Sequence, residues 1–116
     1  MTSDLWKLSA VEMRQGLDAR RFSAHDIMTS VVERMRAVNP PLNAIVYDYG
    51  EQALARAKEA DAALASGESW GDLHGIPVTI KVNVDYEGTP NTNGLPALAE
   101  NIAPGNSPVV QNLLDA

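Results

Sequence analysis

Apolar and polar residues alternate without a break over residues 76–84. The apolar positions are Ile76, Val78, Ile80, Val82 and Val84. Because successive side chains of a strand point to opposite faces, this alternation predicts a strand with one apolar and one polar face. The β-branched residues favour the same structure, and Pro77 fits at the first position of a strand or on an edge. The polar face would carry Thr79, Lys81 and Asn83.

Two helices are predicted in the first third of the chain, each with a capping box at its start. Ser9 and Glu12 have the three-residue spacing of this motif, and Ser23 and Asp26 repeat it. Apolar residues in the second helix recur every three or four positions, as expected for a helix with one buried face. His25 lies in its first turn without partners at ligand spacing, so we interpret it as an exposed helix residue rather than a metal ligand or base.

The ends of these helices are predicted from breaking residues. The first helix is weakened by Gly16, which costs about 1 kcal/mol relative to alanine, and ends near residues 20–21. Residues 39–41, Asn-Pro-Pro, stop the second. Residues 42–49 are apolar and β-prone, which predicts a short strand or an extended connection.

The rest of the chain predicts two more helices and a long loop. An alanine-rich helix covers residues 51–66 and is closed by Gly67. Residues 89–107 are rich in Pro, Gly and Asn and predict a loop. Ser107 then caps a last helix, with Pro108 at its favoured first position.

Composition narrows the class of protein. The 116 residues suit one small domain, and 15 acidic against 9 basic residues give a formal charge of -6. This balance argues against a nucleic-acid surface, which needs concentrated Lys and Arg. No cysteine is present, which excludes disulfides and Cys-ligated metals. With neither a signal peptide nor an apolar run of about 18 residues, we expect a cytoplasmic protein without a membrane partner.

The predicted elements indicate an α/β fold that these residues do not complete. One or two strands and four helices do not form a sheet by themselves. A strand with a face of Ile and Val needs neighbouring strands and a covering layer. We therefore expect N-terminal helices plus the first strands of a mixed-sheet α/β core, incomplete by itself.

Residues 74–85 read HGIPVTIKVNVD. This string resembles the N-terminal signature of the amidase signature family, which typically shows Gly-Ile-Pro, three apolar-leaning positions, Lys-Asp-Asn and an apolar–Asp pair. The sequence departs at Val82, where the family often has an acidic residue. Because Val82 would face the apolar side, away from Lys81, the departure would mark a subgroup with its own substrate range.

The resemblance extends over nearly the whole chain in the family's order. Residues 8–27 resemble the first two helices of the family, residues 51–67 the third, and residues 88–94 the loop after the lysine. We therefore interpret the chain as the N-terminal part of a single amidase signature domain. Its parts are a helical region at about 1–72, a lysine-bearing strand and loop at about 73–106, and a helix at about 107–116.

The resemblance implies an amide hydrolase with a Ser–cis-Ser–Lys triad, in which Lys81 matches the family lysine. That lysine, in its neutral form, would accept a proton from a bridging serine, which would deprotonate the serine that attacks the amide carbonyl. Both serines would lie in a downstream stretch that this sequence does not contain, so the 116 residues alone would be inactive. Thr79 and Asn83 would support Lys81, whereas a nearby Asp85 carboxylate would favour the charged lysine and oppose its role as a base.

Three functions remain open. The first is hydrolysis of a small-molecule amide, with the remainder of the amidase in the same or a separate chain. The second is the amidase subunit of a tRNA-dependent amidotransferase, which delivers ammonia from glutamine. The third is a non-catalytic helical interaction fragment, which an uncovered Ile/Val face argues against. The triad scheme needs no cofactor or metal, and the sequence leaves the amide substrate and a homo-oligomeric state open.

Overall fold

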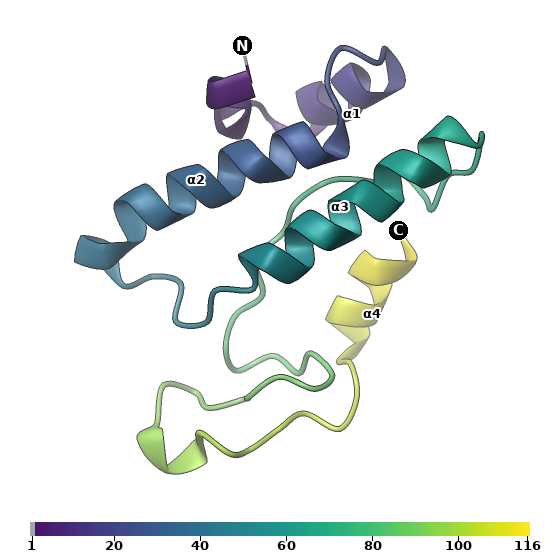
Figure 1. Ribbon diagram of the computed structural model, residues 1–116. Helices are drawn as coiled ribbons and strands as arrows, with labels where there is room; N and C mark the ends of the chain where they lie inside the picture. Colours follow the sequence, from purple (N-terminus) through teal and green to yellow (C-terminus); the bar gives the residue numbers. More distant parts are fainter. Residues whose placement is uncertain (1) are drawn as a thin grey trace. The chain divides into compact units, whose positions relative to one another are not determined.

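The computed structural model describes residues 2–116, and the regular elements in this range are helical (Figure 1). In chain order they are η1 (Thr2–Lys7), α1 (Ala10–Asp18), α2 (Ala24–Leu42), α3 (Gly50–Ala65), η2 (Pro96–Leu98) and α4 (Pro108–Asp115). The chain forms two compact units, Met1–Pro77 and Val78–Ala116. No helix within residues 2–116 combines the length and the apolar character that crossing a membrane requires.

Both predicted capping boxes are formed and set the starts of α1 and α2. The Ser9 hydroxyl accepts the Glu12 backbone N–H, and the Glu12 carboxylate accepts the Ser9 backbone N–H at 2.8 Å. Ser23 and Asp26 make the same reciprocal pair, with both nitrogen–oxygen distances at 2.9 Å. Each box satisfies two backbone N–H groups at a helix start. The Ser9 N–H lowers the pKa of Glu12 because it stabilises the charged carboxylate.

The second helix, α2, continues past its predicted stop. Pro40 and Pro41 lie inside its last turn, and Asn43 follows in the left-handed conformation with a φ of 49°. The prediction was wrong because the φ of proline is itself helical, and both prolines lie at the helix end. Each removes one backbone donor, while the Asn43 N–H still bonds to the Asn39 carbonyl at 2.6 Å and closes the turn.

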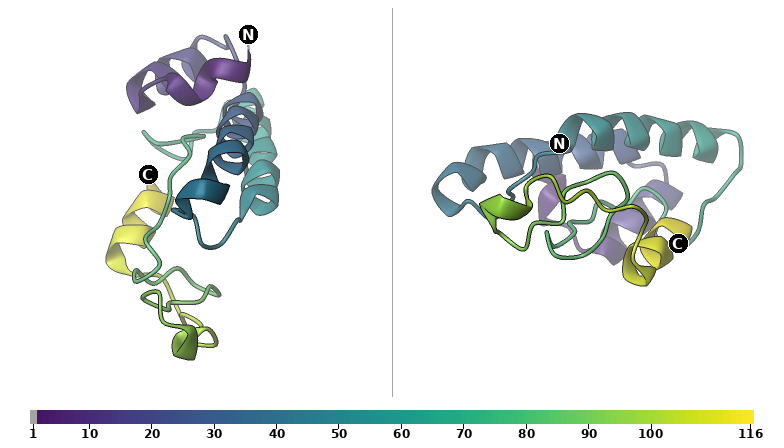
Figure 2. Two further views of the ribbon diagram at one scale, coloured as in Figure 1. Left: turned by 90° about the vertical axis from the view of Figure 1, so that its left-hand side faces the viewer. Right: turned by 90° about the horizontal axis from the view of Figure 1, so that it is seen from below.

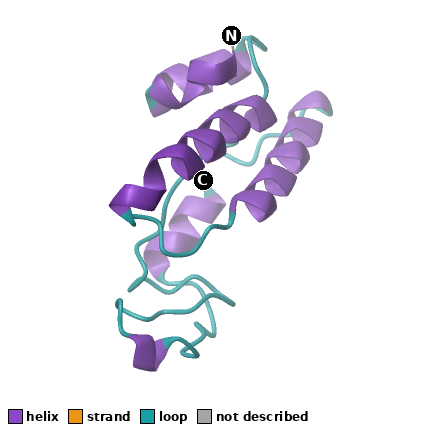
Figure 3. Cartoon of the chain, turned by 60° about the vertical axis from the view of Figure 1, so that its left-hand side comes forward, coloured by secondary structure: helices purple, strands orange, loops and turns teal. Residues whose placement is uncertain are grey.

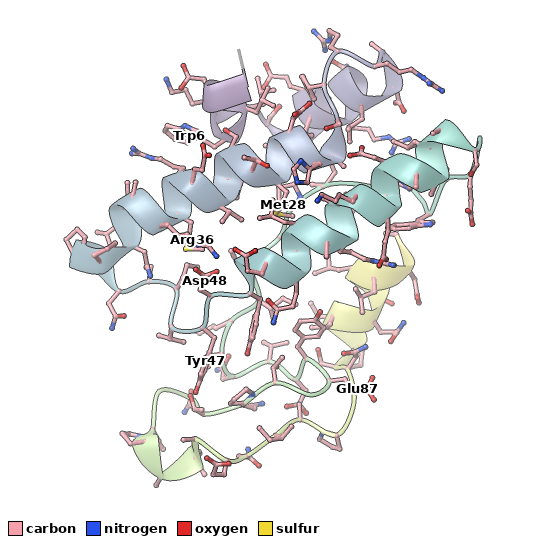
Figure 4. The ribbon with its side chains drawn as sticks, viewed as in Figure 1. Trp6, Met28, Arg36, Tyr47, Asp48 and Glu87 are labelled. Carbon is pink, nitrogen blue, oxygen red and sulfur yellow. The ribbon has the colours of Figure 1, made fainter. Side chains whose placement is uncertain are left out.

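Of the two alternatives predicted for residues 42–49, the short strand is not formed, and residues 43–49 form a connection between α2 and α3. The Asn39 side chain holds this connection, because its amide donates to the Ile45 carbonyl at 2.9 Å and its oxygen accepts the Ile45 N–H at 2.8 Å. Farther along, the Arg36 guanidinium and the Asp48 carboxylate point toward one another (Figure 4) and form an ion pair at 2.8 Å. Local side-chain bonds therefore fix this connection.

Helices α2 and α3 lie side by side in the first unit (Figure 2). Small alanine side chains on α3 let the helices approach closely and contribute to one apolar cluster. Its buried members are Leu5, Met13, Leu17, Ala24, Ile27, Ala57 and Ala60. As predicted, α3 is closed by Gly67, whose φ of 82° suits glycine. The N–H groups of Gly67 and Glu68 bond to the Leu64 and Ala63 carbonyls, which is the Schellman motif.

Asp61, on α3, caps the beginning of α2. One carboxylate oxygen accepts the Ala24 N–H at 2.7 Å and the other accepts the His25 N–H at 3.0 Å. A carboxylate at this position satisfies donors that the helix itself leaves open, and it also interacts favourably with the positive end of the helix dipole. His25 lies in the first turn of α2, as predicted, but it is partly buried there rather than exposed.

The strand predicted over residues 76–84 is not formed within residues 2–116 (Figure 3). The Val84 N–H bonds to the Lys81 carbonyl at 2.9 Å, so the segment turns at its end. The β pairing in the described chain is the isolated bridge between Pro90 and Ile102. A strand needs a neighbour for its backbone groups, and the described residues supply none to this segment. Of the predicted α/β fold, the helices are therefore present here and the strands are not.

Candidate active site

The segment that leads to the lysine begins at a buried histidine. His74 is 2% exposed, and its ring lies 4.6 Å from the ring of Trp70. Its Nδ1 accepts the Trp70 backbone N–H at 2.9 Å, so Nε2 must carry the proton that it donates to the Ala60 carbonyl at 2.8 Å. The Arg56 guanidinium lies 4.0 Å from the centre of the Trp70 ring. Both ring nitrogens of His74 are thus engaged with backbone.

The conformation of the next residue, Gly75, favours glycine. Its φ is +76°, and an added Cβ would come within 3.0 Å of the Leu17 Cδ1 and 3.1 Å of the Ala24 Cβ. The preceding carbonyl, that of His74, accepts a hydrogen bond from the Arg14 guanidinium at 3.3 Å. The His-Gly pair of the sequence motif therefore forms a turn packed between α1, α2 and α3.

Lys81, the predicted catalytic residue, is exposed in the second unit. Thr79 and Asn83, the predicted supporting residues, are exposed as well. In the described part of the chain, the structure records no hydrogen bond that joins any two of these three side chains. The Lys81 side chain therefore lies at the surface of the second unit. Among residues 2–116, no three His, Asp or Glu side chains are grouped to hold a metal ion.

Asp85 has contacts that the sequence pattern did not predict. Its carboxylate accepts a hydrogen bond from the Asn91 side-chain amide, and its carbonyl accepts the Ser107 N–H at 2.9 Å. Ser107 is also the cap of α4, because its hydroxyl accepts the Val110 N–H at 3.3 Å. Asp85 thus joins the start and the end of the segment formed by residues 86–106, which we call the clasped loop.

Backbone bonds also cross the inside of the clasped loop. The Gly88 N–H donates to the Ala103 carbonyl, and the Ala103 N–H donates to the Thr89 carbonyl, both at 2.9 Å. Asn91 bonds with its backbone N–H to the Asn101 carbonyl at 2.8 Å. Ala103 is buried, at 4% exposed. A segment that reads as irregular in sequence is therefore a closed and ordered loop.

The sequence signal for this arrangement is weak. The sequence predicts for Asp85 only an effect of its charge on a nearby Lys81. Asn91, one of several asparagines in the loop, had no assigned role. Asn and Asp side chains often bond to nearby turns, but the sequence does not say which partners meet.

The family described as Amidase matches residues 26–116. The chain belongs to the amidase family. This confirms the resemblance to the amidase signature family on which the interpretation of residues 74–85 depends.

Relatives of this amidase-family chain include enzymes and an enzyme subunit. The indoleacetamide hydrolase of Bradyrhizobium diazoefficiens is 48% identical over 112 residues, which are 97% of this chain and 21% of the relative. The acylamidase of Rhodococcus erythropolis is 40% identical, over 94% of this chain and 23% of its own. A glutamyl-tRNA(Gln) amidotransferase subunit of Caldanaerobacter subterraneus is 39% identical, over 97% and 23%. The chain thus spans about a fifth of the length of the curated relatives it matches.

Proposed function

We propose that residues 1–116 form the N-terminal part of an amidase that hydrolyses a carboxylic amide to an acid plus ammonia or an amine. The observation that carries this proposal is the 48% identity with an indoleacetamide hydrolase. That likeness extends over 97% of the chain, so it includes the lysine-bearing segment. An amide of an arylacetic acid is accordingly the first substrate to test.

In the proposed mechanism, Lys81 is the base of a Ser–cis-Ser–Lys triad. Its neutral amine accepts a proton from the bridging serine, which takes one from the nucleophilic serine as that residue attacks the amide carbonyl. Backbone N–H groups stabilise the oxyanion, and water then releases the acid. Both serines come from sequence outside these 116 residues. The exposed Lys81 side chain is open to such partners, and covering it would favour the neutral amine.

The same proposal assigns a role to the segment before the lysine. Residues 77–80 have no strand partner in the described part of the chain, and strands of an α/β core, supplied outside this sequence, would pair with them. Thr79 and Asn83 would then stand beside Lys81 and orient its amine. Val82 would turn to the opposite, apolar face, because successive side chains of a strand alternate.

A second candidate function is the amidase subunit of a tRNA-dependent amidotransferase. The observation in its favour is the 39% identity with a subunit of a glutamyl-tRNA(Gln) amidotransferase, which is lower than the identity with the hydrolase. Such a subunit would release ammonia from glutamine and would need partner subunits. The free hydrolase would act by itself on a small amide.

Substitution of the lysine tests the proposed function. In the full-length protein, Lys81→Ala would lower kcat on indoleacetamide by at least about a thousandfold, because the nucleophile loses its proton acceptor. Steady-state release of ammonia measures this. The matched control is Lys58→Ala, which removes an exposed lysine on α3 and would leave turnover unchanged. Near-normal activity of Lys81→Ala would overturn the assignment, and activity on glutamine alone would favour the amidotransferase subunit.

A further inference from the structure

The turn of the lysine is joined to the clasped loop through Asp85, which follows Val84 in the chain and accepts hydrogen bonds from Asn91 and Ser107. The Lys81 carbonyl accepts the Val84 N–H at 2.9 Å, which fixes the backbone immediately before Asp85. The backbone carbonyl of Asp85 then accepts the Ser107 N–H, and its carboxylate accepts a hydrogen bond from the Asn91 side-chain amide. Asp85 is therefore the residue at which the lysine turn, the loop and the start of α4 meet.

Asn91 carries the connection across the clasped loop. Its side chain donates to Asp85, while its backbone N–H and carbonyl both bond to Asn101, the latter through the Asn101 side-chain amide at 2.9 Å. Both arms of the loop, at Asn91 and at Asn101, are thus connected by hydrogen bonds to the Asp85 carboxylate. A hydrogen bond to a charged acceptor in a partly buried place is stronger than one between neutral groups, so this contact is suited to hold the loop in one position.

We propose that Asp85 is a positioning residue of the amidase, which fixes the end of the Lys81 turn to the clasped loop through its hydrogen bond to Asn91. This inference rests on the proposed function, because it assumes that Lys81 reacts. Asp85 acts through the backbone that carries the lysine, and it does not itself touch the substrate. Displacement of a reacting group by about 1 Å can cost a hundredfold in rate, so a loosened turn would be visible in kcat.

A different role for Asp85 would be electrostatic. Its negative charge, four residues from Lys81, would favour the protonated amine and slow a reaction that needs the neutral one. The two roles depend on different features of the side chains. Positioning requires an intact donor–acceptor pair, whichever residue carries the charge, whereas the electrostatic role depends on the charge at position 85 itself.

Exchanging the two side chains separates these roles. In the full-length protein, Asn91→Asp places two carboxylates against each other, and we expect kcat on indoleacetamide to fall at least about tenfold, with KM changed less than about twofold. Adding Asp85→Asn to this variant restores one donor and one acceptor with their roles reversed. We expect the double variant to recover kcat to within about threefold of the wild type.

Hydrogen exchange of the loop gives a second measurement, which does not require activity. The amides of Gly88 and Ala103 would exchange faster in Asn91→Asp and return to the wild-type rate in the double variant, because their bonds lie inside the clasped loop. The matched control is Asn93→Asp, which adds the same charge at an exposed position of the same loop. It would change neither kcat nor the exchange rates.

Each outcome decides the proposal. Unchanged kcat and exchange in Asn91→Asp would overturn it, and so would a double variant as impaired as Asn91→Asp. A double variant that is faster than the wild type would assign the electrostatic role to Asp85. A wild-type protein without amidase activity would overturn the proposed function, and catalytic positioning with it, whereas the exchange rates would still measure the contact between Asp85 and Asn91.

Discussion

Gly16 shows how a residue that weakens an element can stabilise the packing around it. By helix propensity alone this glycine costs α1 about 1 kcal/mol, and it looks like a defect in the sequence. In the structure, the Phe22 ring lies on it, and an added Cβ would be 1.9 Å from the Phe22 Cζ. Phe22 packs against the buried cluster, so the missing side chain makes room for an aromatic ring.

A pair of substitutions tests this interpretation of Gly16. Gly16→Ala would destabilise the protein by about 1 kcal/mol, since displacement of the ring outweighs the gain in helix propensity. In a Phe22→Ala background the same change would stabilise by about 0.5 to 1 kcal/mol, because only the propensity remains. Urea unfolding of the four proteins measures both values. The same sign in both backgrounds would contradict the packing argument.

At the scale of elements, Asp61 joins two helices that are far apart in sequence. It lies on α3 and accepts the first two N–H groups of α2, in addition to the capping box that Ser23 makes with Asp26. The capping box could be predicted because its partners are three residues apart. The contact of Asp61 could not, because nothing local in the sequence indicates that the middle of one helix meets the start of another.

Removing this contact would weaken the attachment of α2 to α3. We expect Asp61→Ala to lower the free energy of unfolding by about 1 to 2 kcal/mol, as the loss of a helix cap does elsewhere. The control is Glu59→Ala on the same helix, whose ion pair with Arg56 is exposed and worth less than about 1 kcal/mol. Denaturant unfolding compares the two, and an equal effect of both variants would contradict the capping role.

At the scale of the whole molecule, acid sensitivity follows from carboxylates that are bonded in the folded state. The Arg36 side chain, together with the Gly50 N–H, holds the pKa of Asp48 below its usual range. The folded-state pKa is therefore lower than the unfolded one. The resulting stability is fully present above the ordinary value, near pH 4, and is lost as the pH falls through the lowered value.

A comparison of stability at two pH values tests this linkage. Between about pH 6 and about pH 3, the wild type would lose stability, and Asp48→Asn would lose less, because its side chain no longer binds a proton in this range. Urea unfolding at both pH values measures the two losses. Equal losses in the two proteins would show that Asp48 does not contribute to the acid sensitivity.

The sequence predicts a structure correctly where the residues that determine it lie close together along the chain. Helix starts depend on neighbours a few residues away, so Ser9, Ser23 and Ser107 indicated them correctly. The strand over residues 76–84 depends on partners that the described chain does not contain, so its alternation is visible while its pairing is absent. The role of Lys81 came from a family motif and stays a prediction, and the contact of Asp85 with Asn91 depends on a turn that the sequence pattern does not specify.

The buried ring of His74 has a practical consequence for spectroscopy. Its Nε2 proton is held by the Ala60 carbonyl and is shielded from solvent, while Nδ1 is occupied by the Trp70 N–H. A proton in such a place exchanges slowly with water, so it can be observed as a separate resonance. The resonance of the His74 Nε2 proton would therefore show, without any attached label, whether the turn before the lysine segment keeps its contacts during turnover.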